Sequence, residues 1–421
     1  MLEVLARSAP PSNVRPCEPK AMFNDRVLQV FHSSSTFNPN GYAARSEQIL
    51  ASLDAAGINQ RAITRLGYPW DMLAHRELPK EASSSNSAGW RYQHTPLPAS
   101  GEVSLEASES DYLVAYAKWI ESQAVTHGAS VIHAHSNYLN GLAAIQAAQR
   151  LDVLCVYEMR GLWHVTRASR EPAYATTEHF RFCERRELEA AARAHRVVAL
   201  TKELAEWLVD HGIDGGKVTV VPNAAAALMP VDASADLRVK GRPTIGFVGS
   251  FVDYEGLDLL VEATAHLIQS QPNLKVILVG DGPCAEALKR QISQRGLEAI
   301  FELPGRVGAE SVGDYYRQFD VGVVPRQSTA ITELVSSLKP MELMAYGIPC
   351  VATNLGPIAS MVTDREHLML TPANDAVALA AALGVLLEDS ALRQRLRAGG
   401  LEWATNNGWA RNAQVYRELY G

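Results

Sequence analysis

Cysteine is scarce in this chain of 421 residues. The thiols are odd in number and scattered, and no two of them form a CxxC pair. Such spacing predicts neither a disulfide framework nor a zinc site. The five cysteines are Cys17, Cys155, Cys183, Cys284 and Cys350.

Long apolar runs and an excess of positive charge are also missing. No run of about 18 apolar residues occurs, so the sequence predicts no membrane span. The formal net charge of −7 argues against a dedicated nucleic-acid-binding protein. Residues 1–25 lack the apolar core of a signal peptide, and we expect them to be a loose leader. These features together predict a cytoplasmic location.

The common catalytic signatures are absent as well. The sequence contains no GxSxG elbow, no Walker phosphate loop and no HExxH pair. No DxD pair is present to hold a metal–diphosphate complex. We therefore expect no metal and no cofactor, and a bound diphosphate would be neutralised by side chains and a helix dipole.

What the sequence does contain is a regular alternation of apolar, strand-like segments with helical ones. This alternation predicts an α/β fold of doubly wound parallel sheets, which bind ligands at the carboxyl ends of their strands. The length favours two domains, at residues 26–230 and 240–400. Residues 80–108 are polar and rich in serine and proline, and we expect a long surface excursion there. The expected strands are RVLQVFH, VIHAH, LCVYEMRG, VVALT, VTVVPN, TIGFVGS, KVILVGDG, VGVVPR and PCVATN.

The most informative segment is LVSSLKPMELMAYG, which an apolar strand follows. Pro340 suits the first turn of a helix, and Gly347 suits the position just past its end. The free N–H groups at the start of that helix predict an anion site beside Lys339. Glu342 can accept hydrogen bonds from sugar hydroxyls, or it can serve as a capping carboxylate. A phosphate pocket beside a carboxylate is typical of a nucleotide-sugar site.

Glycine turns and a second cation support this site. Gly249 and Gly282 follow two expected strands and would let a phosphate approach the backbone closely. Arg326 ends a third strand, and Lys339 stands at the expected helix start. Because two cations at such positions can hold a diphosphate, we expect both residues to bind it and to act in catalysis. The alternatives are structural turns and solvated surface cations.

The first half of the chain offers a second group of candidates. Gly41 precedes a helix, either to let backbone N–H groups face a ligand or as a simple tight turn. We expect His133 and His135, which alternate on one strand, to point to opposite faces. His135, nearer the carboxyl end, is the one expected to face the cleft, and a core histidine is the alternative.

Three further residues are candidates on the acceptor side. Arg160 and Trp163 follow the strand LCVYEM, and Tyr42 follows Gly41. Arg160 would either bind an anionic acceptor or pair within its own domain, and the sequence leaves both open.

These segments resemble the family 4 retaining glycosyltransferases of the GT-B type, of the branch that assembles bacterial polysaccharides and glycoconjugates. The resemblance extends from about residue 26 to the end of the chain. It implies two Rossmann-like domains that face each other across a cleft, with the acceptor on the first and the nucleotide-sugar on the second. Residues 401–421 look like the helix that crosses back to the first domain. The motifs are NPNGYAARSEQILASLDAAG, VIHAH, VTVVPNA, IGFVGSFVDYEGLDLLVEA, VILVGDGP and KPMELMAYGIPCVATNLG.

The resemblance also implies roles for single residues. Glu342 matches the acid that binds the ribose hydroxyls, and Gly41 matches the loop glycine beside the donor phosphates. His135 matches the strand histidine near the transferred sugar. Arg306 and Val307 match the stretch that meets the nucleobase.

The sequence departs from the family pattern at the donor site. The family usually has a second acid eight positions before Glu342, where this chain has Leu334, with Glu333 one step away. It usually has Arg and Lys where this chain has Ser250 and Glu255. We expect Arg326 and Lys339 to replace those cations.

The main functional hypothesis is a hexosyltransferase that moves a sugar from a nucleotide-diphosphate-sugar to a saccharide, lipid-linked or small-molecule acceptor. A nucleotide-sugar epimerase or hydrolase of the same fold, and a non-catalytic nucleotide-sugar-binding partner, are the alternatives. The arginine-rich segment 181–196 either touches anionic lipid on the inner face of the membrane or is a solvated helix.

Overall fold

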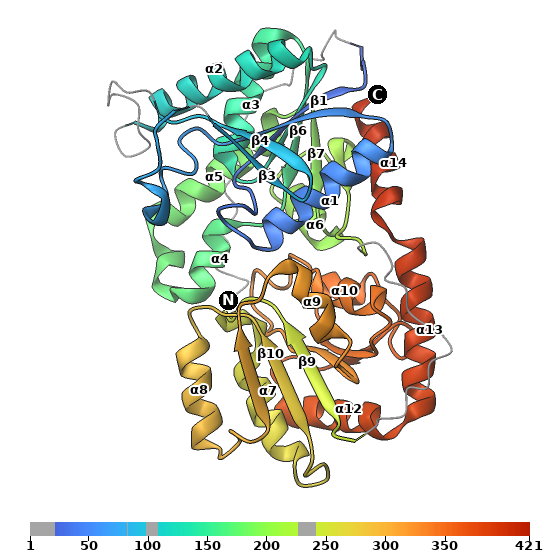
Figure 1. Ribbon diagram of the computed structural model, residues 1–421. Helices are drawn as coiled ribbons and strands as arrows, with labels where there is room; N and C mark the ends of the chain where they lie inside the picture. The colour runs from blue at the N-terminus through green and yellow to red at the C-terminus, as the bar shows by residue number, and fades with distance from the viewer. Residues whose placement is uncertain (1–21, 82, 98–107, 226–240) are drawn as a thin grey trace. The chain divides into compact units, whose positions relative to one another are not determined.

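The chain divides into two compact units, which we describe separately. The first holds the residues up to Pro222 together with Trp409–Gly421, and the second holds Asn223–Gly408. The structure is a computed structural model that describes residues 22–81, 83–97, 108–225 and 241–421 (Figure 1). Most of the expected leader, and the whole stretch between the two expected domains at residues 231–239, lie outside these ranges.

The first unit is built around one eight-stranded sheet with the order β3-β4-β2-β1-β5-β6-β7-β8. All neighbouring strands pair in parallel except β3 and β4. The central strands are buried along nearly their whole length, as a parallel sheet covered on both faces requires. The strands are β1 (Arg26–Phe31), β2 (Asn59–Thr64), β3 (Ser83–Ser87), β4 (Trp90–His94), β5 (Val131–His135), β6 (Leu154–Met159), β7 (Arg196–Ala199) and β8 (Val218–Val220).

Seven α-helices accompany this sheet in the described residues. Helix α14 comes from the far end of the sequence and lies beside α1, where Figure 1 shows it in red next to the blue α1. The helices are α1 (Gly41–Ala55), α2 (Glu109–His127), α3 (Tyr138–Leu151), α4 (Trp163–Arg170), α5 (Glu178–Arg193), α6 (Lys202–Asp210) and α14 (Trp409–Tyr420).

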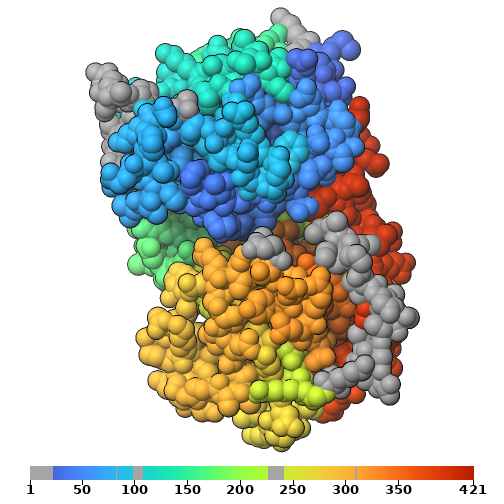
Figure 2. Space-filling view, in the orientation of Figure 1, coloured from blue at the N-terminus to red at the C-terminus, as the bar shows by residue number. Residues whose placement is uncertain are grey.

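The expected surface excursion at residues 80–108 contains a β-hairpin. Strands β3 and β4 pair antiparallel and extend the sheet at its edge beyond β2. The side chains of β3 are mostly exposed, and Figure 2 shows light-blue residues of this region on the surface of the unit. The prediction was right about the exposure of β3, but it missed the strands and the burial of Tyr92 and His94 in β4. Residues 98–107 lie outside the described ranges.

The second unit contains a six-stranded sheet with the order β11-β10-β9-β12-β13-β14. Every neighbouring pair in it is parallel. Its core has two apolar layers, one between the sheet and helices such as α7 and α12, and the other between the sheet and helices such as α10 and α13. The strands are β9 (Thr244–Val248), β10 (Lys275–Val279), β11 (Phe301–Gly305), β12 (Val321–Val324), β13 (Cys350–Thr353) and β14 (Met369–Thr371). The helices are α7 (Leu257–Leu267), α8 (Ala285–Gln294), α9 (Ala309–Tyr316), α10 (Lys339–Ala345), α11 (Gly356–Ala359), α12 (Ala376–Glu388) and α13 (Ser390–Asn406).

The prediction of two doubly wound α/β domains is confirmed. The residues expected to form one returning helix, 401–421, are divided between α13 and α14, and only Trp409–Gly421 belongs to the first unit. Among the described residues, no helix combines the length and the apolar character that a membrane crossing requires.

Candidate active site

Two cations of the second unit converge on one buried carboxylate. Arg326 lies just after β12, Lys339 is the first residue of α10, and Glu255 ends the short 3₁₀ turn Asp253–Glu255 after β9. Glu255 Oε1 lies 3.0 Å from Lys339 Nζ and 3.7 Å from Arg326 Nε. Arg326 and Lys339 therefore lie beside the same carboxylate, and their expected role at a diphosphate stays a prediction. Sequence reasoning treated Glu255 only as a missing cation and did not find it as their partner.

Neighbouring groups hold the two cations differently. Arg326 donates from Nη1 to the carbonyl oxygen of Val335 at 2.9 Å, and its guanidinium lies 5.4 Å from the centre of the Tyr254 ring. Lys339 Nζ lies 5.3 Å from the centre of the Phe247 ring. Arg326 is therefore anchored at its head group, whereas Lys339 is held by an ion pair and a ring face.

Close packing explains why glycine occupies positions 249 and 282. A Cβ at Gly249 would lie 2.2 Å from Lys339 Cε, so the lysine side chain passes directly over this position. A Cβ at Gly282 would lie 2.4 Å from the carbonyl oxygen of Phe251. Gly282 thus allows two loops to pack, while Gly249 makes room for the lysine. Ser250, beside Gly249, is exposed.

Glu342 lies in the first turn of α10, as expected. Its Oε2 accepts a hydrogen bond of 2.9 Å from the Tyr316 hydroxyl, and the side chain is half-buried. The helix begins one residue before Pro340 and contains seven residues. With so short a helix, the case for an anion site depends on the side chains of Arg326 and Lys339.

Leu334 stands where the family usually has a second acid, and Glu333 precedes it. Both side chains are half-buried. Glu333 accepts a hydrogen bond from Ser328 Oγ at 2.5 Å and another from the backbone N–H of Gly356 at 3.2 Å. Glu333 therefore ties two loops together, and Leu334 offers no side-chain donor or acceptor. Arg306 and Val307 follow β11, with Arg306 exposed and Val307 packed against an apolar cluster.

In the first unit, Gly41 is the first residue of α1, after the N-cap Asn40. The Asn40 side chain accepts a hydrogen bond of 3.0 Å from the backbone N–H of Ala43. Nothing lies within 4 Å of a Cβ placed on Gly41, so packing in this structure does not require glycine there. The Tyr42 hydroxyl accepts from the His32 N–H at 2.9 Å and donates to the His135 carbonyl at 3.2 Å.

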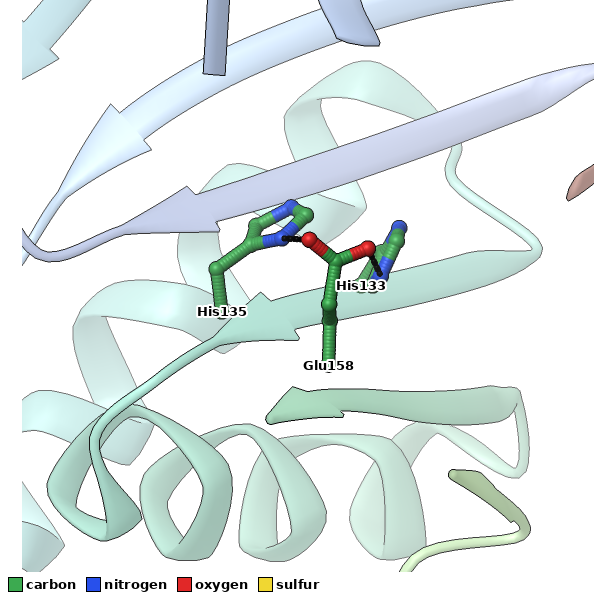
Figure 3. Close-up of side chains that lie close together, drawn as sticks. All are labelled: His133, His135 and Glu158. Atoms are coloured by element: carbon green, nitrogen blue, oxygen red, sulfur yellow. Dashed lines mark ion pairs between the residues drawn. The ribbon is translucent and has the colours of Figure 1, made fainter. Parts of the chain in front are cut away.

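The expectation that His133 and His135 point to opposite faces is wrong. Residues two apart on a strand share a face. Figure 3 shows both rings on the side of β5 that faces Glu158 of β6, and the ring centres are 4.1 Å apart. Both side chains are fully buried, so His135 does not face an open cleft in this structure. Its predicted contact with the transferred sugar stays a prediction.

The hydrogen bonds of His135 are those of a neutral ring. Arg160 Nη2 lies 2.8 Å from His135 Nδ1, and because an arginine nitrogen only donates, Nδ1 must accept. His135 Nε2 then carries the proton and donates to Gln29 Oε1 at 2.8 Å. Burial lowers the pKa of His133 to about 3 and holds the pKa of His135 well below its usual value.

Glu158 is the charged centre of this network. Its Oε1 accepts from Arg45 Nε at 3.1 Å and from Arg160 Nε at 2.8 Å, and its Oε2 accepts from the Tyr416 hydroxyl. Burial alone would raise the pKa of this carboxyl, but Arg45 and Arg160 hold it well below its usual value. The Tyr420 hydroxyl shares a hydrogen bond of 2.8 Å with His133 Nδ1.

Arg160 belongs to this network and pairs within its own unit. Besides Glu158 and His135, it donates to the carbonyl oxygen of Tyr42 at 3.0 Å and to Ser46 Oγ at 2.7 Å. With four of its five N–H groups used and its side chain buried, Arg160 is a structural residue here. The acceptor-side candidate that remains accessible is Trp163, which is 37% exposed and lies edge-on to the His32 ring.

His133, His135 and Glu158 are also the one group among the described residues whose ligand atoms lie close enough to hold a metal, within 4.8 Å of one another. Arginine, glutamine and tyrosine side chains already occupy both carboxylate oxygens, both nitrogens of His135 and Nδ1 of His133. Two guanidinium groups beside the carboxylate also repel a cation. These residues fit a buried charge network and do not fit a metal centre.

Comparison with known proteins places both units in one family. Residues 242–389 match the family described as Glycosyl transferases group 1, and residues 40–224 match the Glycosyl transferase 4-like domain. A D-inositol 3-phosphate glycosyltransferase of Xylanimonas cellulosilytica is 30% identical over 312 residues, which cover 69% of this chain and 71% of that one. The protein of the same name from Nocardia farcinica is 32% identical, covering 56% of this chain and 54% of that one.

Solved structures show the same fold. Sucrose-phosphate synthase from Thermosynechococcus elongatus matches with a TM-score of 0.72 and 22% identity, covering 94% of this chain and 99% of that one. Anabaena HepE in complex with UDP-glucose matches with a TM-score of 0.69 and 16% identity, covering 93% and 98%. Two mainly parallel α/β sheets, the two family matches and the relative that is 30% identical over 69% of this chain together show that this chain belongs to the family 4 glycosyltransferases with the GT-B fold.

Proposed function

We propose that this enzyme transfers a sugar from a nucleoside-diphosphate-sugar to a hydroxyl of a saccharide, lipid-linked or small-molecule acceptor, with retention of the anomeric configuration. The observation that carries the proposal is the convergence of Arg326 and Lys339 at the carboxyl ends of strands in the second unit. A guanidinium fork beside an ammonium group matches the two negative groups of a diphosphate. The HepE complexes with UDP and UDP-glucose make uridine donors the first to test.

In this proposal the two cations act on the leaving group. Negative charge develops on the diphosphate as the bond to the sugar breaks, and Arg326 and Lys339 stabilise it. Glu342 binds the ribose hydroxyls of the donor. The other acids near this site, Glu255 and Glu333, are engaged by neighbouring groups. No carboxylate here is placed to act as a nucleophile on the sugar. We therefore favour a mechanism in which the diphosphate leaves and the acceptor attacks on the same face of the sugar, over one with a covalent intermediate.

The charge balance at the diphosphate also decides whether a cofactor is needed. With two side-chain cations at the diphosphate, no metal or other cofactor is needed.

The named relatives act on inositol 3-phosphate, which makes phosphorylated polyols the first small acceptors to test. We place the enzyme in the cytoplasm, with peripheral contact to the inner membrane face where the acceptor is lipid-linked. The arginine-rich helix α5 is the surface for that contact.

A screen of nucleoside-diphosphate-sugars by thermal shift tests the donor class, because a ligand of the folded state raises the melting temperature. Incubation of the best donor with and without acceptor then separates transfer from epimerisation or hydrolysis, which need no acceptor. No stabilisation by any donor, or full conversion of the donor without acceptor, would contradict the proposal.

Replacement of the cations tests the site. We expect Lys339→Ala and Arg326→Ala each to lower turnover by about 100-fold, since each removes a donor that acts where charge develops. Lys289→Ala is the matched control, because Lys289 is an exposed lysine of α8 paired with Glu286, and we expect it to retain wild-type turnover. Wild-type rates in both site variants would refute the assignment.

A further inference from the structure

Glu255 shares a single oxygen between two cations while its other oxygen has no partner. Oε1 faces both Lys339 and Arg326, and Oε2 is buried without a hydrogen bond. Arg326 Nε is likewise buried and makes no hydrogen bond at its 3.7 Å separation from Oε1. The three side chains are only 7%, 6% and 17% exposed for Glu255, Arg326 and Lys339. Buried polar atoms without hydrogen-bond partners are unfavourable. The site is therefore more stable if one cation leaves Glu255 and the other comes within hydrogen-bond distance of it.

Lys339 is the cation that can leave. It is the most exposed of the three side chains, and no hydrogen bond other than its contact with Glu255 holds its head group in the described structure. Its flexible stem passes over Gly249, which has no side chain to block a turn of the ammonium group. Arg326, in contrast, is anchored by the carbonyl oxygen of Val335 and by Tyr254.

We propose that Glu255 is a built-in competitor of the diphosphate, an inference that rests on the proposed function. Without nucleotide, the carboxylate holds Lys339. When the diphosphate binds, Lys339 turns to it, and Arg326 closes on Glu255 with Nε while its Nη2 group faces the diphosphate. After transfer, Glu255 recaptures Lys339, which weakens the hold on the nucleoside diphosphate product and speeds its release. Glu255 is thus a positioning residue that acts through Lys339.

The substitution Glu255→Gln tests this exchange, because it keeps the shape of the side chain and removes its charge. We expect UDP to bind about fivefold or more tightly to the variant, with the change mainly in a slower dissociation rate. Uridine, which has no phosphate, should bind with unchanged affinity. The ratio of the UDP and uridine affinities therefore isolates the phosphate contribution from a general loss of structure.

Two variants serve as controls for this measurement. Asp258→Asn removes an exposed carboxylate three positions away, which contacts Gln327. It changes the net charge equally and should leave the UDP-to-uridine ratio as in the wild type. In a Lys339→Ala background, Glu255→Gln should no longer raise this ratio. Equal gains in Asp258→Asn, or a gain that persists without Lys339, would overturn the inference.

Wild-type crystals provide a measurement that does not depend on the folding of a variant. We expect Lys339 Nζ to lie 3.0 Å from Glu255 in the nucleotide-free enzyme and to contact phosphate oxygen, away from Glu255, when UDP is bound. An intact contact in the UDP complex, or a Glu255→Gln variant that binds UDP no more tightly than wild type, overturns this inference alone. A wild-type enzyme that binds none of UDP, GDP and ADP overturns the proposed function as well.

Discussion

At the scale of single residues, charge is placed differently in the two units. The first unit has a fully buried acid with two guanidinium groups, whose net positive charge is spread over many hydrogen bonds. The second unit has an acid with two cations that are poorly bonded to it. The well-bonded network is suited to hold a structure, and the poorly bonded one is suited to exchange partners.

Glu342 gives the first test at this scale. We expect Glu342→Ala to weaken binding of the nucleoside diphosphate about tenfold, because a hydrogen bond between a hydroxyl and a charged carboxylate is lost. Calorimetry with UDP measures the change. Tyr316→Phe retains the carboxylate and removes only its 2.9 Å hydrogen bond from Tyr316, so a smaller loss is expected. Wild-type affinity in Glu342→Ala would argue against the ribose role.

The buried histidines predict a dependence of stability on pH. His133 has a pKa of about 3 in the folded protein, against about 6.5 when unfolded. Between these values the unfolded state binds more protons, so stability is present above pH 6.5 and is lost as the pH falls. We expect His133 to contribute a loss of about 1.4 kcal/mol in the free energy of unfolding between pH 7.5 and 5.5.

The substitution His133→Gln separates this contribution from others. Glu187, whose pKa burial raises to about 7, titrates in the same range with the opposite sign in both proteins. The difference between wild type and variant therefore isolates the histidine. Urea unfolding at the two pH values measures it, and equal pH dependence in both proteins would show that His133 is not kept neutral by the fold.

Residue identity could be predicted from the sequence better than residue environment. Arg326, Lys339 and Glu342 were found because cations and an acid at strand ends and in a first helical turn have a recognisable use. Glu255 was missed as their partner because nothing in its spacing shows that the loop after β9 reaches Lys339, which is 84 positions away in the numbering. The network around His135 and Glu158 was missed for the same reason, because Gln29 lies 106 positions from His135 and Tyr416 lies 258 positions from Glu158.

At the scale of helices and strands, the sequence predicted the strands that carry continuous apolar runs. It did not predict β2, β3, β4, β11 and β14. Of these, β3, β11 and β14 lie at sheet edges, where one side needs no strand partner and polar residues are tolerated. Strand β2 begins with three polar residues, of which the first is exposed and the next two are half-buried, and it is fully buried only in its second half. A periodicity argument has little to detect in such segments.

Helix α14 allows a matched test at this scale. Its Tyr416 hydroxyl donates to the charged Glu158, and its Tyr420 hydroxyl shares a hydrogen bond with the neutral His133. Hydrogen bonds to charged groups contribute more, so we expect Tyr416→Phe to lower the free energy of unfolding by about 2 kcal/mol and Tyr420→Phe by about 1 kcal/mol. Denaturant titration of both variants checks the order, and the reverse order would contradict the central role of Glu158.

At the scale of the whole molecule, the two sheets assign the candidate donor residues to different units. Gly41 and His135 belong to the first, and Glu342, Arg326 and Lys339 belong to the second. The alternation of strands and helices was enough to predict two such sheets. The exact limits of the units were not predictable, because the change from α13 to α14 occurs within a sequence that is helical on both sides.

Hydrogen exchange with and without UDP tests this division. We expect the nucleotide to slow exchange of the backbone amides at residues 249–256 and 338–342, and at 306–307 where the base is expected. If Gly41 contacts the donor phosphates, the amides at the start of α1 should be protected as well. Uridine is the control: it should protect the base segment and the region of Glu342, which binds the ribose in our proposal, but not residues 249–256. Protection of the second unit without α1 would remove Gly41 from the donor site.

The path of the chain has a consequence for biosynthesis. Glu158 and Tyr416 are separated by 258 positions, and the whole second unit is translated between them. During synthesis of that unit, Glu158 and His133 lack the hydrogen bonds that the hydroxyls of Tyr416 and Tyr420 later make with them. The buried network of the first unit is therefore complete only after α14 has been synthesised.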